Sequence, residues 1–131
     1  MTTHIMNMTY GPKIAGVMDG CIRQTIRRTG KFHVGDKLII HTWTGKPYRS
    51  PWGQRMNAVI KEIIKIECYD EYYEEADWIC PWNGPRATAL ATLDGIDPPT
   101  GPALKEVLEK FHGKFHGNDP DKAAWFQVIR W

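Results

Sequence analysis

The sequence predicts one α+β domain, a small β-barrel or barrel-like fold with flanking short helices. The chain has 131 residues, which is enough for a single domain with its own hydrophobic core. Hydrophobic residues make up 42% of it and charged residues 24%, as in soluble globular proteins. Strand-like segments surround a few helical ones without the β-α-β alternation that produces a parallel sheet. We therefore expect residues 1–131 to form one domain.

The first expected element is a short amphipathic helix that begins near Pro12. Apolar residues recur at helical spacing between residues 14 and 22. Pro12 suits the first turn, where its missing N–H would have no partner in any case. Gly20 suits the end, because glycine readily takes the left-handed conformation that closes a helix. Residues 24–27 are then expected to form a short strand.

The middle of the chain predicts two strands joined by a loop. Residues 37–43 are rich in β-branched and aromatic side chains and follow a Gly-Asp turn. Residues 44–53 contain glycines and prolines, so we expect a loop there. Residues 56–69 are the expected partner strand. Their spacing also fits a helix, but four isoleucines and a valine favour a strand.

Two helices and a terminal strand complete the prediction. Residues 86–93 suit a helix that ends at Gly95. A clearer amphipathic helix follows over residues 104–111, with Thr100 as its N-cap and Gly113 as its end. Residues 125–131 are expected to form the last strand.

Charge is distributed unevenly, although the net charge is only +2. Residues 13–55 contain nine lysines and arginines against two aspartates, whereas residues 62–77 contain seven acidic residues against one lysine. One interpretation is that the basic half faces an anionic ligand. The other is that the molecule has two solvated faces of opposite charge.

Several classes of protein are disfavoured. No apolar run approaches the roughly 18 residues of a membrane span, and residues 1–10 lack the features of a secretory signal. Three scattered cysteines form no disulfide framework, so we expect a cytoplasmic protein without a membrane partner. Without a Cys-x-x-Cys pair, a Walker loop or a Gly-x-Gly-x-x-Gly sequence, no metal and no cofactor are expected.

Three landmarks, taken in order, resemble the ASCH family, a branch of the PUA-like barrels; the third combines two segments. Residues 20–27 (GCIRQTIR) are similar to the family's Gly-x-Lys-x-x-Thr-x-Arg motif. Residues 32–38 (FHVGDKL) are similar to its Phe-x-x-Gly-Asp-x-Leu motif. Residues 93–96 (LDGI) and 128–131 (VIRW) resemble its acidic turn and terminal strand. The resemblance covers residues 14–131 and rests on the order of these segments.

This resemblance implies a small PUA-like/ASCH β-barrel that binds RNA or a modified nucleoside or nucleotide. Some relatives are acetylcytidine amidohydrolases, and others are ribonucleases or RNA-binding modules. In the hydrolytic relatives a lysine, a threonine and an acidic residue act together; Thr25 and Asp94 match the last two. The motif lysine is replaced by Ile22, and an adjacent arginine cannot act as a base. A base would have to come from Lys13 or Lys31, outside the motif.

The leading hypothesis is therefore an RNA- or nucleotide-binding module with a basic cleft. Guanidinium groups hold phosphate through paired hydrogen bonds, and aromatic rings stack on bases. The loop over residues 42–52 interleaves such groups. The candidate ligand-binding residues are Arg23, Arg27, Arg28, Trp43, Lys46, Tyr48, Arg49 and Trp52.

Two alternatives remain open. The first is a hydrolase, an acetylcytidine-type amidohydrolase or a weak ribonuclease, with Thr25 and Asp94 as catalytic residues. Asp94 precedes Gly95, so it also suits an ordinary turn. The second is a protein-interaction domain that uses the acidic segment 69–75, although such a run is usually a solvated edge.

Overall fold

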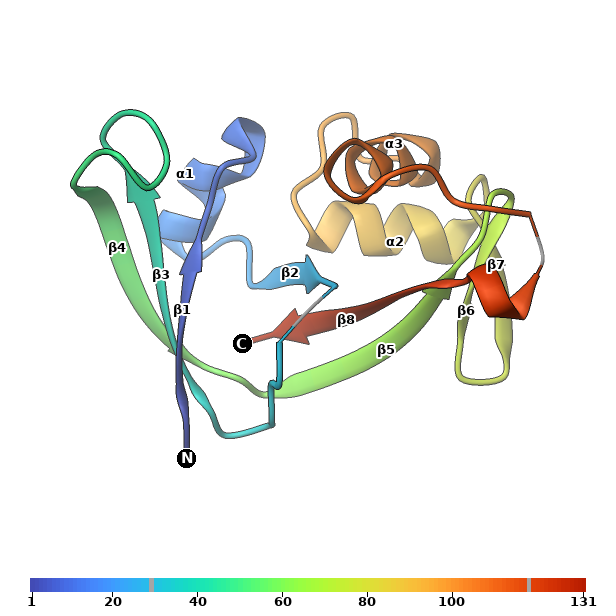
Figure 1. The fold of residues 1–131 in the computed structure, drawn as a ribbon, viewed down its shortest axis with the longest axis horizontal. Coiled ribbons are helices and arrows are strands. Elements are labelled where there is room, and N and C mark those ends of the chain that lie inside the picture. Colours follow the sequence, from blue (N-terminus) through green and yellow to red (C-terminus); the bar gives the residue numbers. More distant parts are fainter. Residues whose placement is uncertain (29, 118) are drawn as a thin grey trace.

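The computed structural model describes residues 1–28, 30–117 and 119–131, and it shows an α+β fold with two β-sheets (Figure 1). In chain order the elements are β1 (Thr3–Asn7), α1 (Gly11–Asp19), β2 (Gln24–Arg27), β3 (Lys37–Trp43), β4 (Trp52–Val59), β5 (Glu62–Cys68), β6 (Tyr72–Glu75), β7 (Trp78–Pro81), α2 (Pro85–Leu93), α3 (Gly101–His112), the short 3-10 helix η1 (Pro120–Lys122) and β8 (Ala124–Arg130).

The two sheets differ in size and in strand direction. The smaller has the order β1-β3-β4, with β1 parallel to β3 and β4 antiparallel to it. The larger has the order β2-β8-β5-β6-β7, and all of its neighbouring strands are antiparallel. Parallel pairing of β1 with β3 requires a long connection. The connection from β1 to β3 contains α1 and β2. The chain thus leaves the smaller sheet after β1, forms α1 and one strand of the larger sheet, and then returns to the smaller sheet.

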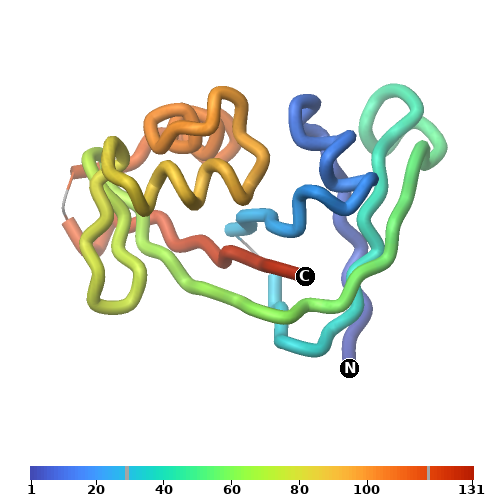
Figure 2. The backbone as a smooth tube through the Cα atoms, turned by 180° about the vertical axis from the view of Figure 1, so that it is seen from behind, coloured from blue at the N-terminus to red at the C-terminus, as the bar shows by residue number. Residues whose placement is uncertain are grey.

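The predicted closed barrel is wrong, because both sheets are open within the described residues. The expected single strand over residues 56–69 is divided at Ile60 into β4 and β5, which belong to different sheets. The Ile60 N–H donates to Asp36 O, whereas the Lys61 N–H donates to Arg130 O. Figure 2 shows this continuous path from one sheet to the other. The edge strands are β1 and β4 in the smaller sheet and β2 and β7 in the larger one, and no strand pairing among the described residues joins the two sheets into a cylinder.

Two hydrophobic cores lie on the two sheets. The helices α2 and α3 cover one face of the larger sheet, where Phe126 and Val128 pack with Leu104 and Leu108. The helix α1 contributes Val17 to a second core with residues of the smaller sheet, such as Leu38 and Ile40. Strand β8 contributes to both cores, because successive residues of a strand face opposite sides: Phe126 and Val128 belong to the first core and Ile129 to the second.

The predicted helices are confirmed. Gly20 ends α1 with a left-handed φ of 86°, as the sequence indicates. Thr100 caps α3: its side chain accepts a hydrogen bond from the Ala103 N–H at 3.2 Å. The strands β2 and β3 have the predicted bounds, whereas β1, β6 and β7 were not predicted. Among the described helices, none has both the length and the apolar character that crossing a membrane requires.

Candidate functional site

A lysine of α1 lies at the centre of the candidate site. The side chain of Lys13 is buried and points into the space between α1, β2 and the end of α2, with only 4% of the residue exposed. Its Nζ lies 3.2 Å from Gln24 O, 3.4 Å from Thr25 Oγ1 and 3.3 Å from Asp94 Oδ2. The amine therefore has three oxygen neighbours, which matches the three hydrogens of an ammonium group.

Thr25 is placed by β2, which pairs with β8 alone among the described strands. Thr25 is opposite Ile129 in the register, and its hydroxyl faces Lys13 rather than solvent. A threonine at this position suits the strand because its side chain is β-branched. Its hydroxyl is the nearest candidate nucleophile to the Lys13 amine.

Asp94 completes the group from the C-terminal end of α2. Its backbone N–H donates to Leu90 O, and the next residue, Gly95, has a left-handed φ of 73°. A Cβ at Gly95 would lie 2.3 Å from the Ile22 side chain and 3.1 Å from Lys13 Cβ. The glycine thus permits both the turn and the close approach of Lys13. The turn and the site, which the sequence offers as alternatives for Asp94, coexist.

A hydrogen-bonded chain holds the Asp94 carboxylate in place. Gln24 Nε2 donates to Asp94 Oδ1 and to Leu90 O, both at 3.2 Å. Gln24 Oε1 in turn accepts from Arg130 Nε at 2.8 Å, and Arg130 is paired with the exposed Glu62 at 2.7 Å. Gln24 is 1% exposed, so its amide is fixed by these partners.

Burial shifts both members of the Lys13–Asp94 pair towards their neutral forms. Burial lowers the pKa of Lys13, the Asp94 charge opposes that change, and the Arg27 charge reinforces it. Burial likewise raises the pKa of Asp94, against the effect of the Lys13 charge and the hydrogen bond from Gln24. A free amine beside a hydroxyl is the arrangement that a general base requires.

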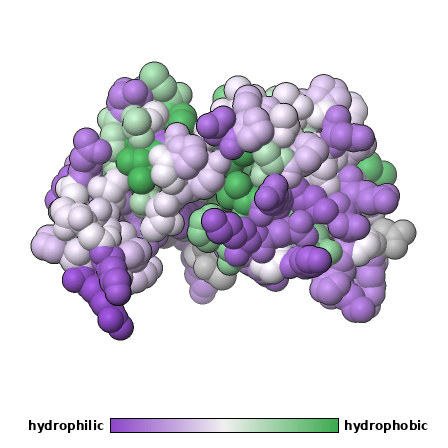
Figure 3. Space-filling view, turned by 90° about the horizontal axis from the view of Figure 1, so that it is seen from above, coloured by the Kyte–Doolittle hydropathy of each residue, from purple (hydrophilic) through white to green (hydrophobic). Residues whose placement is uncertain are grey.

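A pocket of about 290 Å³ lies over the side chains of Lys13, Thr25 and Asp94. Its apolar wall comes from the turn after α2 and from α3, through Ile96, Val107, Leu108 and Phe111. Seen from above, hydrophobic residues lie in the hollow between the α1 side and the α2–α3 side (Figure 3). The pocket thus combines a reactive polar floor with a hydrophobic wall, which is typical of sites for small organic molecules.

The arginines named by the sequence do not converge in this pocket. Arg27 does line it: the guanidinium donates to Asn7 O at 2.8 Å, and burial lowers the pKa of Arg27. Arg23 is exposed and donates to Gly20 O. Arg28 is exposed, donates to His112 O and lines a different groove. The basic cleft expected from these three residues is therefore reduced to Arg27.

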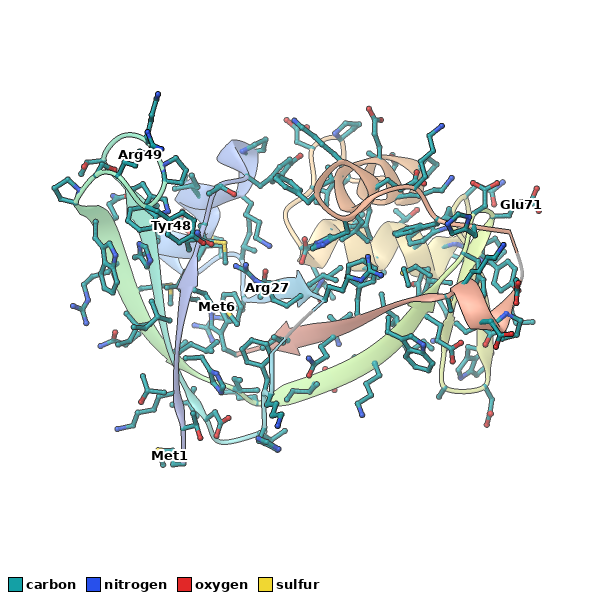
Figure 4. All side chains as sticks on the ribbon, in the orientation of Figure 1. Met1, Met6, Arg27, Tyr48, Arg49 and Glu71 are labelled. Carbon is teal, nitrogen blue, oxygen red and sulfur yellow. The ribbon has the colours of Figure 1, made fainter. Side chains whose placement is uncertain are left out.

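The candidate residues in and beside the loop between β3 and β4 also separate into those that line a pocket and those that do not. Trp43, Tyr48 and Trp52 line a second pocket of about 370 Å³ that shares Asn7 and Arg27 with the first. The Tyr48 hydroxyl accepts from Asn7 Nδ2 at 3.1 Å. In Figure 4, Tyr48 lies on the side of the loop that faces Arg27, although 81% of it is exposed, whereas Arg49 points away from the molecule. Lys46 is exposed and, like Arg49, lines neither pocket.

Sequence reasoning left the base unassigned and did not identify Gln24 at all. The sequence offers Lys13 and Lys31 as possible bases, but only the packing of α1 in the folded chain shows that Lys13 is buried. Lys13 and Val17 are four residues apart and both buried, so they lie on the same face of the helix. This four-residue spacing is the feature of the sequence that could have indicated the burial of Lys13. The other lysine, Lys31, lines the groove that contains Arg28.

The described residues contain no group of three or more His, Cys, Asp or Glu side chains that could hold a metal ion. Comparisons of the chain with protein-family models, with curated proteins and with solved structures find no match. The resemblance to the ASCH family therefore stays a prediction, and the function must be inferred from the geometry of the site.

Proposed function

We propose that the protein is a hydrolase that cleaves the acyl bond of a small amide, with Thr25 as nucleophile and Lys13 as general base. The observation that carries this proposal is the buried Lys13 amine 3.4 Å from Thr25 Oγ1, at the floor of a ligand-sized pocket. The family resemblance suggests an acylated pyrimidine nucleoside, such as N4-acetylcytidine, as the substrate class. Three free thiols support a cytoplasmic setting as part of the same proposal.

In the first step, Thr25 Oγ attacks the carbonyl carbon of the substrate while its proton passes to Lys13 Nζ. The resulting ammonium and the Arg27 guanidinium, which lines the pocket, both favour the developing oxyanion. When the carbon–nitrogen bond breaks, the ammonium returns its proton to the leaving nitrogen. The products of this step are the free amine and an acyl ester on Thr25.

In the second step, water takes the place of the amine. Lys13 removes a proton from the water as it attacks the acyl ester, and the same proton then passes to Thr25 Oγ as the ester bond breaks. The acid leaves, and Thr25 and Lys13 regain their starting states. Asp94 and Gln24 position the amine throughout, through the contacts of 3.3 Å and 3.2 Å described above.

The geometry favours this hydrolase over the RNA- or nucleotide-binding module that the sequence placed first. A phosphate cleft at residues 23–28 would require several guanidinium groups to face one pocket, and only Arg27 does so. The Asp94 carboxylate, 3.3 Å from the Lys13 amine, would repel a phosphate anion at this place. Burying two ionisable side chains together is costly for stability, and buried pairs with shifted pKa values are concentrated at functional sites, which supports the proposal.

The test is hydrolysis of N4-acetylcytidine, followed by chromatographic detection of cytidine. Thr25→Val keeps the β-branched shape and removes the hydroxyl, and Lys13→Met keeps the length and removes the amine. We expect each substitution to reduce kcat/KM by about 10²–10⁴-fold, the usual contribution of such groups. Thr25→Ser should retain part of the activity because it keeps a hydroxyl.

The matched control is Lys37→Met, which makes the same change at an exposed lysine of β3. It should leave turnover unchanged. Circular dichroism must show that each variant is folded, because removal of one partner from a buried ion pair costs about 3–5 kcal/mol. Full activity in a folded Thr25→Val variant, or no turnover of acetylcytidine and related acyl amides by the native protein, would refute the proposal.

A further inference from the structure

A wide groove lies on a different surface from the candidate active site. It has a volume of about 730 Å³. Its floor is formed by Ile63 and Lys65 of β5 and by Trp125 and Gln127 of β8. These residues alternate with Ile66, Phe126 and Val128, which pack against the helices, so the floor is the sheet face that α2 and α3 leave open. Residues 30–34, between β2 and β3, form one wall (Figure 1).

The groove is basic, and its cations have no carboxylate partners. Arg28, Lys31 and Lys65 all line it and are all exposed. None of the described residues in the lining is acidic, and within the described chain none of the three cations forms an ion pair. Glu67, which is opposite Trp125 in the register, shares this face of the sheet but does not line the groove, so the lining itself is basic.

Aromatic rings lie among these cations. Trp125 is 52% exposed on β8, although its neighbours Ala124 and Phe126 are buried. Phe32 is half-buried in the opposite wall. Arg28 is held in position, since it donates to His112 O at 3.1 Å and lies 6.0 Å from the centre of the Phe126 ring. The wall is fixed to the floor by the hydrogen bond from Gln127 Nε2 to Gly30 O at 2.9 Å.

We propose that this groove binds single-stranded nucleic acid. Cations along a groove bind successive phosphates, and an exposed indole stacks on a base; the combination is typical of proteins that bind single strands with little sequence preference. A duplex is disfavoured, because stacking on Trp125 requires an unpaired base. The surface differs from the basic cleft predicted at residues 23–28, and of that cleft it retains only Arg28.

The groove is also connected to the candidate active site by shared residues. Phe32 lines both the groove and the aromatic pocket of Trp43, Tyr48 and Trp52. Arg27 and Asn7 line both the aromatic pocket and the pocket above Thr25. Binding in the groove does not depend on the proposed hydrolase, so the two proposals can fail separately.

The test is fluorescence anisotropy of a labelled oligouridylate of about twelve nucleotides, titrated at several salt concentrations. The test variant is Arg28→Gln/Lys31→Gln/Lys65→Gln. We expect it to bind at least tenfold more weakly at low salt. The slope of log affinity against log salt should fall in magnitude by about two, because each lost phosphate contact on a single strand contributes about 0.7.

The control variant, Lys61→Gln/Lys114→Gln/Lys122→Gln, loses the same charge at exposed lysines outside the groove. It should keep the affinity and the slope of the native protein, as should Thr25→Val. Equal losses in the two triple variants would mean that only total charge matters and would overturn the proposal. Absence of binding at low salt would overturn it as well.

A second ligand separates nucleic acid from other polyanions. Trp125→Ala should weaken binding of oligouridylate by about 5- to 100-fold, the effect of losing one stacked base, and should leave binding of heparin unchanged. If Trp125→Ala has no effect on oligouridylate, the groove does not recognise bases and the assignment to nucleic acid is wrong.

Discussion

At the scale of single residues, the account depends on a lysine that the fold removes from water. An ammonium group without solvent is costly, and the cost is reduced either by a paired carboxylate or by loss of the proton. Lys13 has both possibilities, since Asp94 lies 3.3 Å away and burial lowers the pKa of Lys13. The same environment that makes this residue expensive for stability makes it useful as a base.

The role of Asp94 can be tested through the pH dependence of kcat/KM. The free amine is the active form, so kcat/KM should fall as the pH drops through the lowered pKa of Lys13. The charge of Asp94 raises that pKa, and Asp94→Asn removes the charge. We therefore expect Asp94→Asn to move the acidic limb of the profile to lower pH, together with a reduced maximum rate.

Asp97→Asn provides the control, because Asp97 is exposed and lies three residues further along the same turn. Its profile should coincide with that of the native protein. A limb that stays in place or moves to higher pH in Asp94→Asn would show that Lys13 is not the titrating base.

The residues of the site differ in how far they were predictable. Thr25 and Asp94 lie within the segments that resemble the ASCH family, so the sequence predicts them. Gln24 is adjacent to Thr25 but faces the other side of β2, and only the packing of α2 gives it Leu90 O and Asp94 as partners. Its importance arises from tertiary contacts, which no local pattern encodes.

At the scale of secondary structure elements, Asp36 fastens the N-terminal strand to the start of β3. Its carboxylate accepts from the Thr2 N–H at 3.2 Å and the His33 N–H at 3.1 Å, and lies 2.8 Å from His4 Nε2. The hydrogen bond with His4 and those two backbone N–H groups lower the pKa of Asp36 to about 2, although burial opposes them. The predicted Gly-Asp turn thus also secures β1, a strand that was not predicted.

Asp36 should therefore affect stability in a pH-dependent manner. A carboxyl with a lower pKa in the folded chain stabilises the fold above its unfolded value near 4, and this contribution is lost as the pH falls through about 2. Asp36→Asn should destabilise the protein in urea at pH 7. The difference from the native protein should shrink between about pH 4 and pH 2. A difference that is constant over this range would contradict the assignment.

At the scale of the whole molecule, local patterns predicted the elements better than their assembly. Helix ends at Gly20 and Thr100 and the strands β2 and β3 follow from capping and side-chain preferences. The chain passes from one sheet into the other at Ile60, and among the described residues no strand pairing joins the two sheets into a barrel. An isoleucine within a run of strand-forming residues gives no local indication of such a change of partner.

The site belongs to this level as well, because Lys13, Thr25 and Asp94 come from different parts of the fold. Lys13 is supplied by α1, Thr25 by β2 and Asp94 by the end of α2. The three meet only after the helices have packed on their sheets. The central claim is that this assembly allows the Lys13 amine to activate the Thr25 hydroxyl.

The most direct measurement is mass spectrometry of the protein after brief reaction with an activated acetyl ester and rapid acid quenching. We expect one acetyl group on the peptide that contains Thr25 in the native protein, and a strong reduction of that label in Lys13→Met. An acetyl group on Lys13 itself, or equal labelling of Thr25 in both proteins, would contradict the account.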